Sequence, residues 1–344
     1  MTPAGRTGGL PSVRVGVIGV GYLGQHHARI YSQLPGVTLI GVADTVRERA
    51  DEVAKAARTK AFYDPQALLD QVDAVSIVVP TVSHYEAASL FLKKGVHVML
   101  EKPMTQTLSE ADHLIELAEK RKIVLQIGHL ERFNSAIRML AGVICEPRFV
   151  EVHRLGGFAD RGTDVDVVLD LMIHDIDILL SLVPSDVSEI RAAGTPVISQ
   201  SIDIANARIE FKNGCVANVT ASRVSREPMR KIRIFQPDAY LSLDYKNQEL
   251  VVAKRVQNAK GISFFSSLWR SSRVPGMPGI VVEKIKVKKE EPLKAELESF
   301  IQAVRFGEKP IVSGREGREA LKVALQVMEQ IRLHTRRAQE AGRS

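Results

Sequence analysis

Three side chains in this sequence have the types and surroundings that acid–base chemistry on an alcohol requires. Asp170 and His174 are four residues apart in an apolar stretch, so a helix there places both on one face. An imidazole beside a carboxylate is suited to act as a general base for a hydroxyl proton. Lys102 follows a run of apolar residues, where an ammonium is costly unless it faces a cleft, and there it could stabilise an alkoxide. The alternatives are an Asp/His pair that ties a helix to its neighbours and a lysine at a solvated strand end.

A glycine-rich motif runs from Gly19 to Gly24 between an apolar stretch and a helical one. In a dinucleotide-binding unit the first glycine, Gly19, makes the tight turn, and the second, Gly21, lets the backbone approach a pyrophosphate. The third, Gly24, lets helix and strand pack closely. The phosphates would lie at the N–H groups of the helix start, beside Tyr22 and Leu23. Glycine-rich turns also arise for purely structural reasons, so the context decides.

Asp44 supplies that context and favours NAD as the cofactor. It ends the next apolar stretch, twenty residues after Gly24, where a carboxylate accepts the ribose hydroxyls and repels a 2′-phosphate. Arg47 and Arg49 follow closely, and their positive charges could instead accommodate the 2′-phosphate of NADP. Asp44 and Thr45 could also simply cap the following helix. NAD is predicted, with NADP as the less favoured alternative.

Short apolar stretches alternate with amphipathic ones in the first part of the chain and would position these residues. Val- and Ile-rich runs of this length predict buried strands, and the stretches between them predict helices. Such alternation predicts right-handed βαβ crossovers and a parallel sheet covered on both faces. The expected strands are 13–20, 37–44, 74–80, 97–103 and 123–129, and the expected helices are 22–34, 45–58, 65–71, 82–94 and 109–121.

After about residue 130 the pattern changes to strands separated by turn signals. Two alternating runs flank Asn213-Gly214 and predict a hairpin with a type I′ turn, and 231–255 repeats the pattern. The expected helices are 131–143, 166–183, 292–307 and 314–337, the first further strand is 148–157, and 258–279 is expected to be a loop or lid.

The predicted fold is an α/β Rossmann domain with a doubly wound parallel sheet, followed by an α+β domain with a large, mainly antiparallel open sheet. The expected boundaries are a flexible leader over 1–12, the NAD-binding domain over 13–128, the substrate and oligomerisation domain over 129–337, and a frayed tail over 338–344.

The composition is that of a soluble, two-domain protein. The chain has 344 residues, 45% of them hydrophobic, enough for two ordinary cores. Its longest apolar runs are too short to cross a bilayer, and the N-terminus does not resemble a secretory signal, so no membrane partner and a cytoplasmic location are expected. Two cysteines without a CxxC pair predict neither disulfides nor a metal site. The net charge of +7 could favour a phosphate-bearing small molecule, and nothing in the sequence indicates nucleic-acid binding.

The residues resemble the glucose–fructose oxidoreductase / inositol dehydrogenase / rhizopine-catabolism (Gfo/Idh/MocA) oxidoreductases. The resemblance covers nearly the whole chain and is carried by "VGVIGVGYLGQHHARIY", "GVAD", "IVVPTVSHYEAASLFLKKGVHVMLEKPMTQTLSEADHLIELAE", "GHLERFNSA", "LDLMIHDID" and "IEFKNGCVANVTASR". It implies that Lys102, Asp170 and His174 flank the nicotinamide and the reacting carbinol. It also implies further cofactor contacts from Pro80, Thr81, His84 and Glu101, and substrate contacts from His129, Arg132 and Asn134.

Two positions qualify what the resemblance implies. For Arg132, a salt bridge with a nearby carboxylate such as Glu131 or Glu101 is an equal alternative. Met172 stands where many family members have glycine, which concerns how closely a substrate ring approaches that helix.

The resemblance implies a hydride-transfer mechanism. His174, assisted by Asp170, would take the hydroxyl proton of a ring alcohol, Lys102 would stabilise the oxyanion, and the carbinol hydride would pass to C4 of NAD+. It also implies a homodimer or homotetramer. An intact set of Lys102, Asp170 and His174 favours an enzyme over a non-catalytic NAD-binding regulator or scaffold.

The substrate is expected to be a sugar or a nucleotide sugar. "GHLERFN" with "LDLMIHDIDIL" is most similar to family members that oxidise the 3-position of a UDP-N-acetylhexosamine. A free sugar or an inositol is the alternative. Several basic residues could bind a diphosphate, or could equally form the solvated face of an antiparallel sheet: Arg223, Arg226, Arg230, Lys231, Arg233, Arg270 and Arg273.

Overall fold

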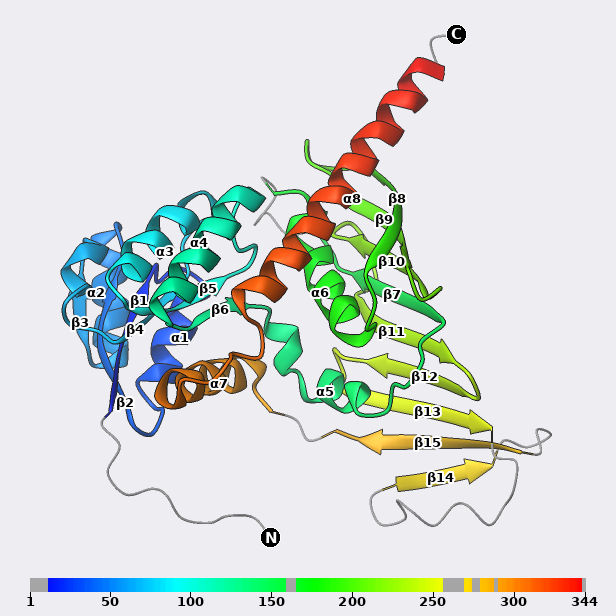
Figure 1. Ribbon diagram of the computed structural model, residues 1–344, viewed down its shortest axis with the longest axis horizontal. Coiled ribbons are helices and arrows are strands. Elements are labelled where there is room, and N and C mark those ends of the chain that lie inside the picture. Colours follow the sequence, from blue (N-terminus) through cyan, green and yellow to red (C-terminus); the bar gives the residue numbers. More distant parts are fainter. Residues whose placement is uncertain (1–11, 159–164, 256–268, 274–278, 288–289, 342–344) are drawn as a thin grey trace. The chain divides into compact units, whose positions relative to one another are not determined.

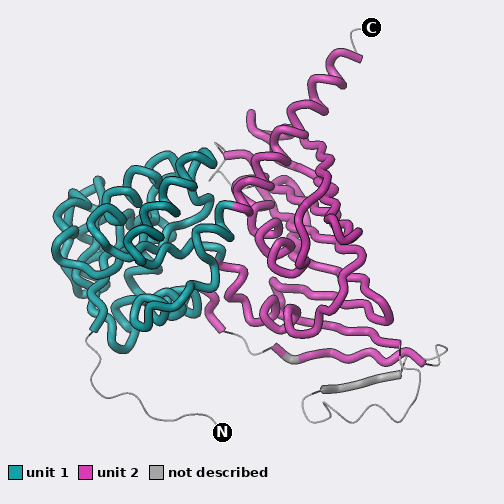
Figure 2. Tube along the Cα trace, viewed as in Figure 1, with its two compact units in different colours: residues 1–129, 293–318 teal, residues 130–292, 319–344 magenta. Residues whose placement is uncertain are grey.

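The computed structural model describes residues 12–158, 165–255, 269–273, 279–287 and 290–341. The chain divides into two compact units (Figure 2). Unit 1 holds residues 1–129 and 293–318, and unit 2 holds residues 130–292 and 319–344. The second domain was expected over 129–337, and residues 293–318 of that range belong to unit 1. The leader expected over 1–12 lies outside the described residues except for Ser12.

Unit 1 is built on a parallel sheet, which confirms the predicted fold class. Its described strands have the order β3-β2-β1-β4-β5-β6, and every neighbouring pair is parallel. The short edge strand β3 was not expected, because three residues carry too little pattern to be recognised. The strands are β1 (Val13–Ile18), β2 (Val37–Ala43), β3 (Lys60–Phe62), β4 (Ala74–Ile77), β5 (His97–Glu101) and β6 (Leu125–Gly128).

Helices connect these strands, and Figure 1 shows α3 and α4 side by side. A capping box between Thr107 and Glu110 begins α4, which satisfies two N–H groups of its first turn. The helix expected over 65–71 is instead a short 3-10 turn. The helical elements are α1 (Gly24–Tyr31), α2 (Arg47–Ala57), η1 (Pro65–Leu68), η2 (Thr81–Ser83), α3 (His84–Lys93) and α4 (Leu108–Arg121).

Residues 293–318 complete unit 1 because they cover its β6 edge. The N–H of Ile127 donates to the carbonyl of Val312 at 2.9 Å, so the segment before α8 (Gly314–Ala341) pairs with an otherwise open strand. A Cβ on Gly317 would lie 2.5 Å from Ile127, so α8 starts in direct contact with that strand. The preceding helix α7 (Pro292–Phe306) buries Leu297 and Phe300.

Unit 2 is built on a large and mainly antiparallel sheet, as predicted. Among the described residues it has nine strands in the order β14-β15-β13-β12-β11-β7-β10-β9-β8, and within them only β7 and β10 pair in parallel. The strands are β7 (Phe149–Leu155), β8 (Val187–Thr195), β9 (Ile204–Phe211), β10 (Val216–Ser222), β11 (Met229–Gln236), β12 (Ala239–Asp244), β13 (Glu249–Arg255), β14 (Trp269–Arg273) and β15 (Ile280–Lys286).

The hairpin predicted around Asn213-Gly214 joins β9 and β10, but its turn differs from the expected one. Gly214 has φ +84°, whereas Asn213 is not among the residues with positive φ. The N–H of Gly214 donates to the carbonyl of Phe211 at 2.9 Å. This is a longer hairpin loop closed by a left-handed glycine, since a type I′ turn needs positive φ at both central residues.

Helices cover one face of this sheet and form the core of unit 2. The inward side chains of alternating strand positions, such as Val150, Val152 and Ile234, pack with Ile176 and Val327. The covering elements are α5 (Ser135–Ala141), the π-helical turn η4 (Val168–Met172), α6 (Ile173–Leu182) and the part of α8 from residue 319 onward. The short η3 (Leu130–Phe133) packs against α5 and α6.

Two sequence expectations are corrected at the end of the chain. The tail expected to fray from residue 338 is helical to Ala341, because α8 continues that far. Within the expected loop over 258–279, residues 269–273 form β14, and 258–268 and 274–278 lie outside the described residues. In the part of the chain that the structure describes, no helix has the length and apolarity that spanning a membrane requires.

Candidate functional site

The glycine-rich turn after β1 has the shape that a bound pyrophosphate requires. Gly19 has φ +82°, and a Cβ there would lie 2.4 Å from the carbonyl oxygen of Val78. A Cβ on Gly24 would lie 1.9 Å from the carbonyl oxygen of Gly19, so both positions exclude any side chain. At Gly21, by contrast, a Cβ would meet only the Arg49 guanidinium, at 4.0 Å, among the described residues. The backbone at Gly21 is therefore open to a ligand, and α1 begins just behind it.

A cavity of about 870 Å³ lies at this turn, along the carboxyl ends of β1, β2, β4 and β5. This is the edge where open parallel sheets hold nucleotides. Among the residues expected to bind cofactor, those that line the cavity are Gly19, Gly21, Tyr22, Leu23, Asp44, Pro80, Glu101 and Lys102. Gly24, Thr81 and His84 do not line it. The open backbone and this lining fit a dinucleotide.

Asp44 is held rigidly at the cavity wall. Its carboxylate accepts the N–H of Val20 and the N–H of Val46, both at 2.9 Å, and only 8% of the residue is exposed. These bonds hold the carboxylate at the cavity, but it does not cap α2: the N-cap residue of that helix is Val46, and no side chain caps it. The guanidinium of Arg49 lies 3.4 Å from the same carboxylate, while that of Arg47 stacks on the ring of Tyr63.

Lys102 lies in the turn that leaves β5, and its neighbour Glu101 is firmly anchored. The Lys102–Pro103 peptide is cis. The Glu101 carboxylate accepts the N–H of Lys102 at 3.3 Å and lies 3.4 Å from His27 Nε2 on α1. A Cβ on Gly128 would lie 2.8 Å from this carboxylate, so the end of β6 packs directly against Glu101. These contacts hold the start of the turn close to the sheet.

His84 has a different environment from the one the resemblance implied. The ring is 1% exposed, with Nδ1 2.9 Å from the carbonyl oxygen of Pro103 and Nε2 2.9 Å from that of Val79. Both nitrogens therefore face backbone carbonyls, and the side chain lies beneath the cavity wall. Thr81 begins the short η2 turn on the same loop.

Asp170 and His174 lie in unit 2, on the transition from η4 to α6. The sequence predicts an ordinary α-helix here, but residues 168–172 form a π-helical turn, a feature frequent at functional sites. Asp170 and His174 are partly exposed, whereas Met172, Ile173 and most of α6 are buried. Met172 at 0% exposure packs into the core, so its departure from the family glycine fills the interior.

A buried ion-pair network fixes α6 beside His174. Arg154 on β7 donates to both carboxylate oxygens of Asp175, at 2.8 and 3.0 Å, and to Glu131 at 3.2 Å. The Tyr245 hydroxyl donates to Asp175 at 2.7 Å. The Arg154 guanidinium lies over the ring of Tyr245. Burial acts to lower the pKa of Arg154, but the Asp175 carboxylate outweighs it and the pKa lies well above its usual value.

Sequence reasoning missed Arg154 and Tyr245, although a signal exists. In β7 the inward positions are Val150, Val152 and Arg154, so an arginine stands where the alternation demands an apolar residue. A charge at such a position requires a buried partner.

The residues of the "GHLERFN" segment are mostly engaged with the protein itself. Arg132 lies 3.4 Å from Asp177, so the salt-bridge alternative holds with a carboxylate that was not among the expected partners. Asn134 caps α5 by accepting the N–H of Ala136 at 3.0 Å, and its amide donates to Glu131 at 3.3 Å. His129 is 1% exposed. The Asn134 amide is thus engaged within unit 2.

Arg223 is buried and engaged within unit 2, which fits neither alternative given for it, a diphosphate ligand or a solvated sheet face. Its guanidinium donates to Asp203 at 2.7 Å and to the carbonyl of Val165 at 2.7 Å, just before η4. Asp203 also accepts the N–H groups of Val197 and Ile198 at 2.8 and 2.7 Å. Burial acts to raise the pKa of Asp203, but the Ser199 hydroxyl and these N–H groups outweigh it and hold the pKa well below its usual value.

Replacing Asp203 by alanine is expected to destabilise the protein by about 3 kcal/mol, because it removes one partner of a buried ion pair with Arg223. Since the folded-state pKa of Asp203 is lowered, the stabilisation is present at neutral pH and lost as the pH falls below about 4. Urea unfolding from pH 7 to pH 3 measures both effects. Glu210→Ala, which removes an exposed pair with Arg208, should cost less than about 1 kcal/mol. Equal costs for the two variants would contradict the assignment.

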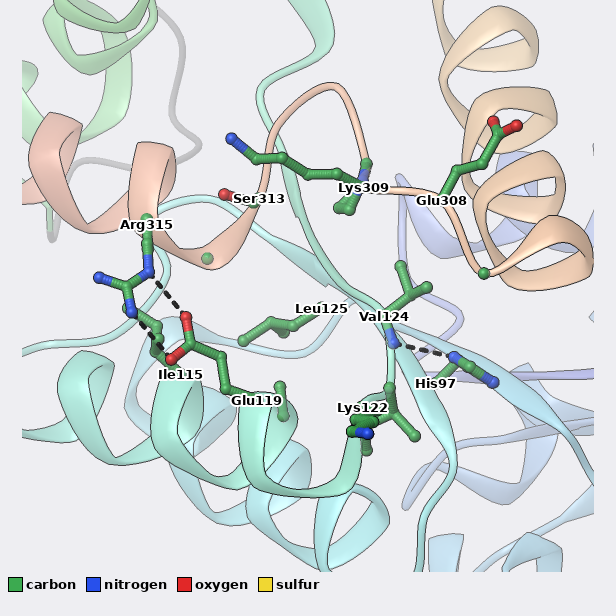
Figure 3. Close-up of a pocket in the computed structure, with 15 residues that line it drawn as sticks. His97, Ile115, Glu119, Lys122, Val124, Leu125, Glu308, Lys309, Ser313 and Arg315 are labelled. Carbon is green, nitrogen blue, oxygen red and sulfur yellow. Dashed lines mark hydrogen bonds and ion pairs between the residues drawn. The ribbon is translucent and has the colours of Figure 1, made fainter.

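A second cavity, of about 450 Å³, lies at the opposite edge of the unit 1 sheet, where β5 and β6 begin (Figure 3). Three of the charged side chains that line it form ion pairs. Arg315 forms two hydrogen bonds with Glu119, at 2.7 and 2.8 Å, and Lys309 pairs with Glu316. The N–H of Val124 donates to His97 Nδ1 at 2.9 Å. The candidate chemistry of unit 1 therefore lies at the other edge, around Lys102.

Comparisons with known proteins agree with this arrangement. Residues 13–129 match the family model described as "Oxidoreductase family, NAD-binding Rossmann fold", and residues 136–241 match "GFO/IDH/MocA C-terminal domain". A UDP-N-acetylglucosamine 3-dehydrogenase from Acidithiobacillus ferrooxidans is 42% identical, over 92% of this chain and 96% of its own. A solved structure of an enzyme of that name from A. ferrooxidans has a TM-score of 0.86 and 40% identity, covering 94% of this chain and 98% of its own. The myo-inositol 2-dehydrogenase of Thermotoga maritima is 27% identical, over 90% and 93%. The chain therefore belongs to the GFO/IDH/MocA family of oxidoreductases, and its unit 1 contains the NAD-binding Rossmann fold of that family.

Proposed function

We propose that this oxidoreductase oxidises the 3-hydroxyl of a UDP-N-acetylhexosamine to the keto sugar, with NAD+ as hydride acceptor. The observation that carries the substrate is the 42% identity, over 96% of its length, to a protein named as a UDP-N-acetylglucosamine 3-dehydrogenase. Over similar coverage, two inositol dehydrogenases are each 27% identical. This difference favours a nucleotide sugar over a free sugar or an inositol.

Three side chains would carry the chemistry. NAD+ supplies a hydride acceptor at C4 of its nicotinamide. His174, beside Asp170, takes the proton of the sugar hydroxyl, and Lys102 stabilises the oxygen as negative charge develops. The support from unit 1 is that Lys102 lines the nucleotide cavity, and the support from unit 2 is that Asp170 and His174 are partly exposed on a mostly buried helix.

Backbone and side chains of unit 1 would bind the cofactor. The N–H groups that open α1 would hold the pyrophosphate beside Gly21, and Asp44 would accept the ribose hydroxyls. The fixed Asp44 carboxylate would repel a 2′-phosphate, and the nearby Arg49 is already paired with that carboxylate. Gly24 would act through packing alone, and Pro80, Thr81 and Glu101 would shape the cavity wall or its support.

Substrate contacts are proposed from unit 2 and its boundary. His129 and Arg132 would lie nearest the sugar, and Arg132 keeps 18% of its side chain exposed. Arg226 and Arg230 are exposed and remain candidates for the diphosphate.

We also propose that the protein is a cytoplasmic homodimer or homotetramer. The support for assembly is an aromatic cluster on the sheet face opposite the core of unit 2. The rings of Phe149, Phe235 and Tyr240 pack with centroids 5.8 and 5.1 Å apart, and Phe235 is 39% exposed. An exposed cluster of this kind is typical of an interface.

The substrate proposal is tested by following NADH at 340 nm with purified protein. UDP-N-acetylglucosamine is expected to react with a kcat/KM about 10²-fold or more above N-acetylglucosamine and myo-inositol, because the diphosphate supplies binding energy that a free ring lacks. Mass spectrometry should show a sugar nucleotide lighter by two hydrogen atoms. Preference for a free ring, or no reaction with any UDP-sugar, would remove the proposal. NAD binding without turnover of any candidate would favour a regulator.

A further inference from the structure

We infer that His84 is a positioning residue for Lys102: its ring ties the turn that carries the lysine to the loop that follows β4. The inference rests on the role proposed for Lys102 and assigns His84 to neither cofactor binding nor proton transfer. It goes beyond the family resemblance, which implied direct contact between His84 and the cofactor.

The two carbonyls that His84 contacts belong to two different loops at the nucleotide cavity. Pro103 directly follows Lys102, and Val79 lines the cavity itself, next to Val78. The Val78 carbonyl in turn lies directly against Gly19, where a Cβ would clash at 2.4 Å. One buried ring therefore joins the lysine turn to a loop that is already locked against the glycine-rich turn.

Hydrogen-bonding capacity shows why this position is demanding. A neutral imidazole has one N–H donor and one acceptor, so it can donate to only one of two carbonyls, whereas an imidazolium can donate to both. Burial lowers the pKa of His84, while the carbonyls of Pro103 and Val79 and the charge of Glu101 act to raise it. Such a site does not suit an apolar side chain, which offers neither buried carbonyl a donor.

A second buried histidine supports the same turn from α1. His27 is fully buried, and its Nε2 lies 3.4 Å from the Glu101 carboxylate, which also accepts the N–H of Lys102. The lysine is thus flanked by one anchored residue on each side, Glu101 before it and Pro103 after it. His27 contacts Glu101, and His84 contacts Pro103.

Substitutions of His84 can test the contacts of its two ring nitrogens one at a time. An asparagine amide reaches roughly where Nδ1 lies, and a glutamine amide roughly where Nε2 lies. His84→Asn therefore keeps a donor for Pro103, His84→Gln keeps a donor for Val79, and His84→Leu keeps neither. Tyr85→Phe is the matched control, because it removes a hydrogen bond to His113 from the next residue of the same helix.

The first measurement needs no substrate. The full-length protein is treated with acetic anhydride, and the acylation rate of Lys102 is followed by peptide mass spectrometry, with exposed Lys94 as internal reference. His84→Gln and His84→Leu are expected to change the Lys102 rate severalfold relative to wild type. His84→Asn and Tyr85→Phe should stay close to it.

The second measurement is turnover with whichever UDP-sugar reacts. His84→Gln and His84→Leu are expected to lower kcat by about tenfold or more, with the Kd for NADH nearly unchanged, since a misplaced catalytic group costs rate rather than cofactor affinity. His84→Asn should recover most of the loss. Equal effects of Asn, Gln and Leu that follow the loss of thermal stability would overturn the inference, as would wild-type Lys102 reactivity in all three variants. If no UDP-sugar reacts, the acylation rates still decide the positioning role.

Discussion

Replacing Lys102 by methionine is expected to lower turnover by about 10²–10³-fold while the affinity for NAD+ changes little. Methionine is similar in length to the lysine stem but carries no charge, so the change removes the group proposed to stabilise the developing oxyanion. The cavity wall keeps its shape because the backbone of this turn is held by Glu101 and His84. The loss should therefore appear in kcat and in kcat/KM together, which marks an interaction made in the transition state.

Stopped-flow absorbance at 340 nm and calorimetric titration with NADH measure the two quantities separately. Lys94→Met, at an exposed position outside the cavity, is the control and should behave as wild type. Turnover of Lys102→Met at the wild-type rate would contradict the catalytic role of Lys102. A large loss of NADH affinity would place the lysine among the binding groups instead.

Replacing Gly21 by valine is expected to weaken NAD+ binding by about 30-fold or more, which corresponds to ~2 kcal/mol, with little effect on stability. The added side chain projects toward the space in which a pyrophosphate would lie, and among the described residues a Cβ there meets only Arg49 at 4.0 Å. Gly24→Ala should instead act first on stability. Its Cβ would lie 1.9 Å from the Gly19 carbonyl oxygen, so unit 1 could keep its fold only with a displaced α1.

Thermal unfolding and NADH titration of both variants check this pair of expectations. The Gly21 variant should unfold near the wild-type temperature and bind NADH poorly, while the Gly24 variant should unfold at a much lower temperature. A Gly21 variant with normal NADH affinity would show that the nucleotide does not approach this turn.

The local features of unit 1 could be predicted from the sequence because they depend on short-range rules. The spacing of Gly19, Gly21 and Gly24 specifies a strand, a tight turn and a helix within twelve residues of chain. The alternation of apolar and amphipathic stretches specifies a parallel sheet, and its order places Asp44 and Lys102 at one edge. In each case, residues close together in the sequence determine the backbone geometry.

Boundaries and small departures from regular structure followed from packing instead. The π-helical turn η4 has no local signal in the sequence, and neither has the three-residue strand β3. Residues 293–318 return to unit 1 because the β6 edge needs a hydrogen-bonded cover, a requirement that exists only once the sheet has formed.

By itself, the sequence determined the two kinds of sheet, the nucleotide-binding turn and the candidate groups Lys102, Asp170 and His174. Only the tertiary structure decided which polar residues serve the fold. Arg223, Asn134 and His84 all resemble ligand-binding residues in the sequence, yet each has its polar atoms engaged by protein groups. The physical reason is that a buried polar side chain must find partners, and some of those partners lie far along the chain: Asp203 is 20 residues from Arg223, and Pro103 is 19 residues from His84. Residue type shows what a side chain can bind, and packing determines what it does bind.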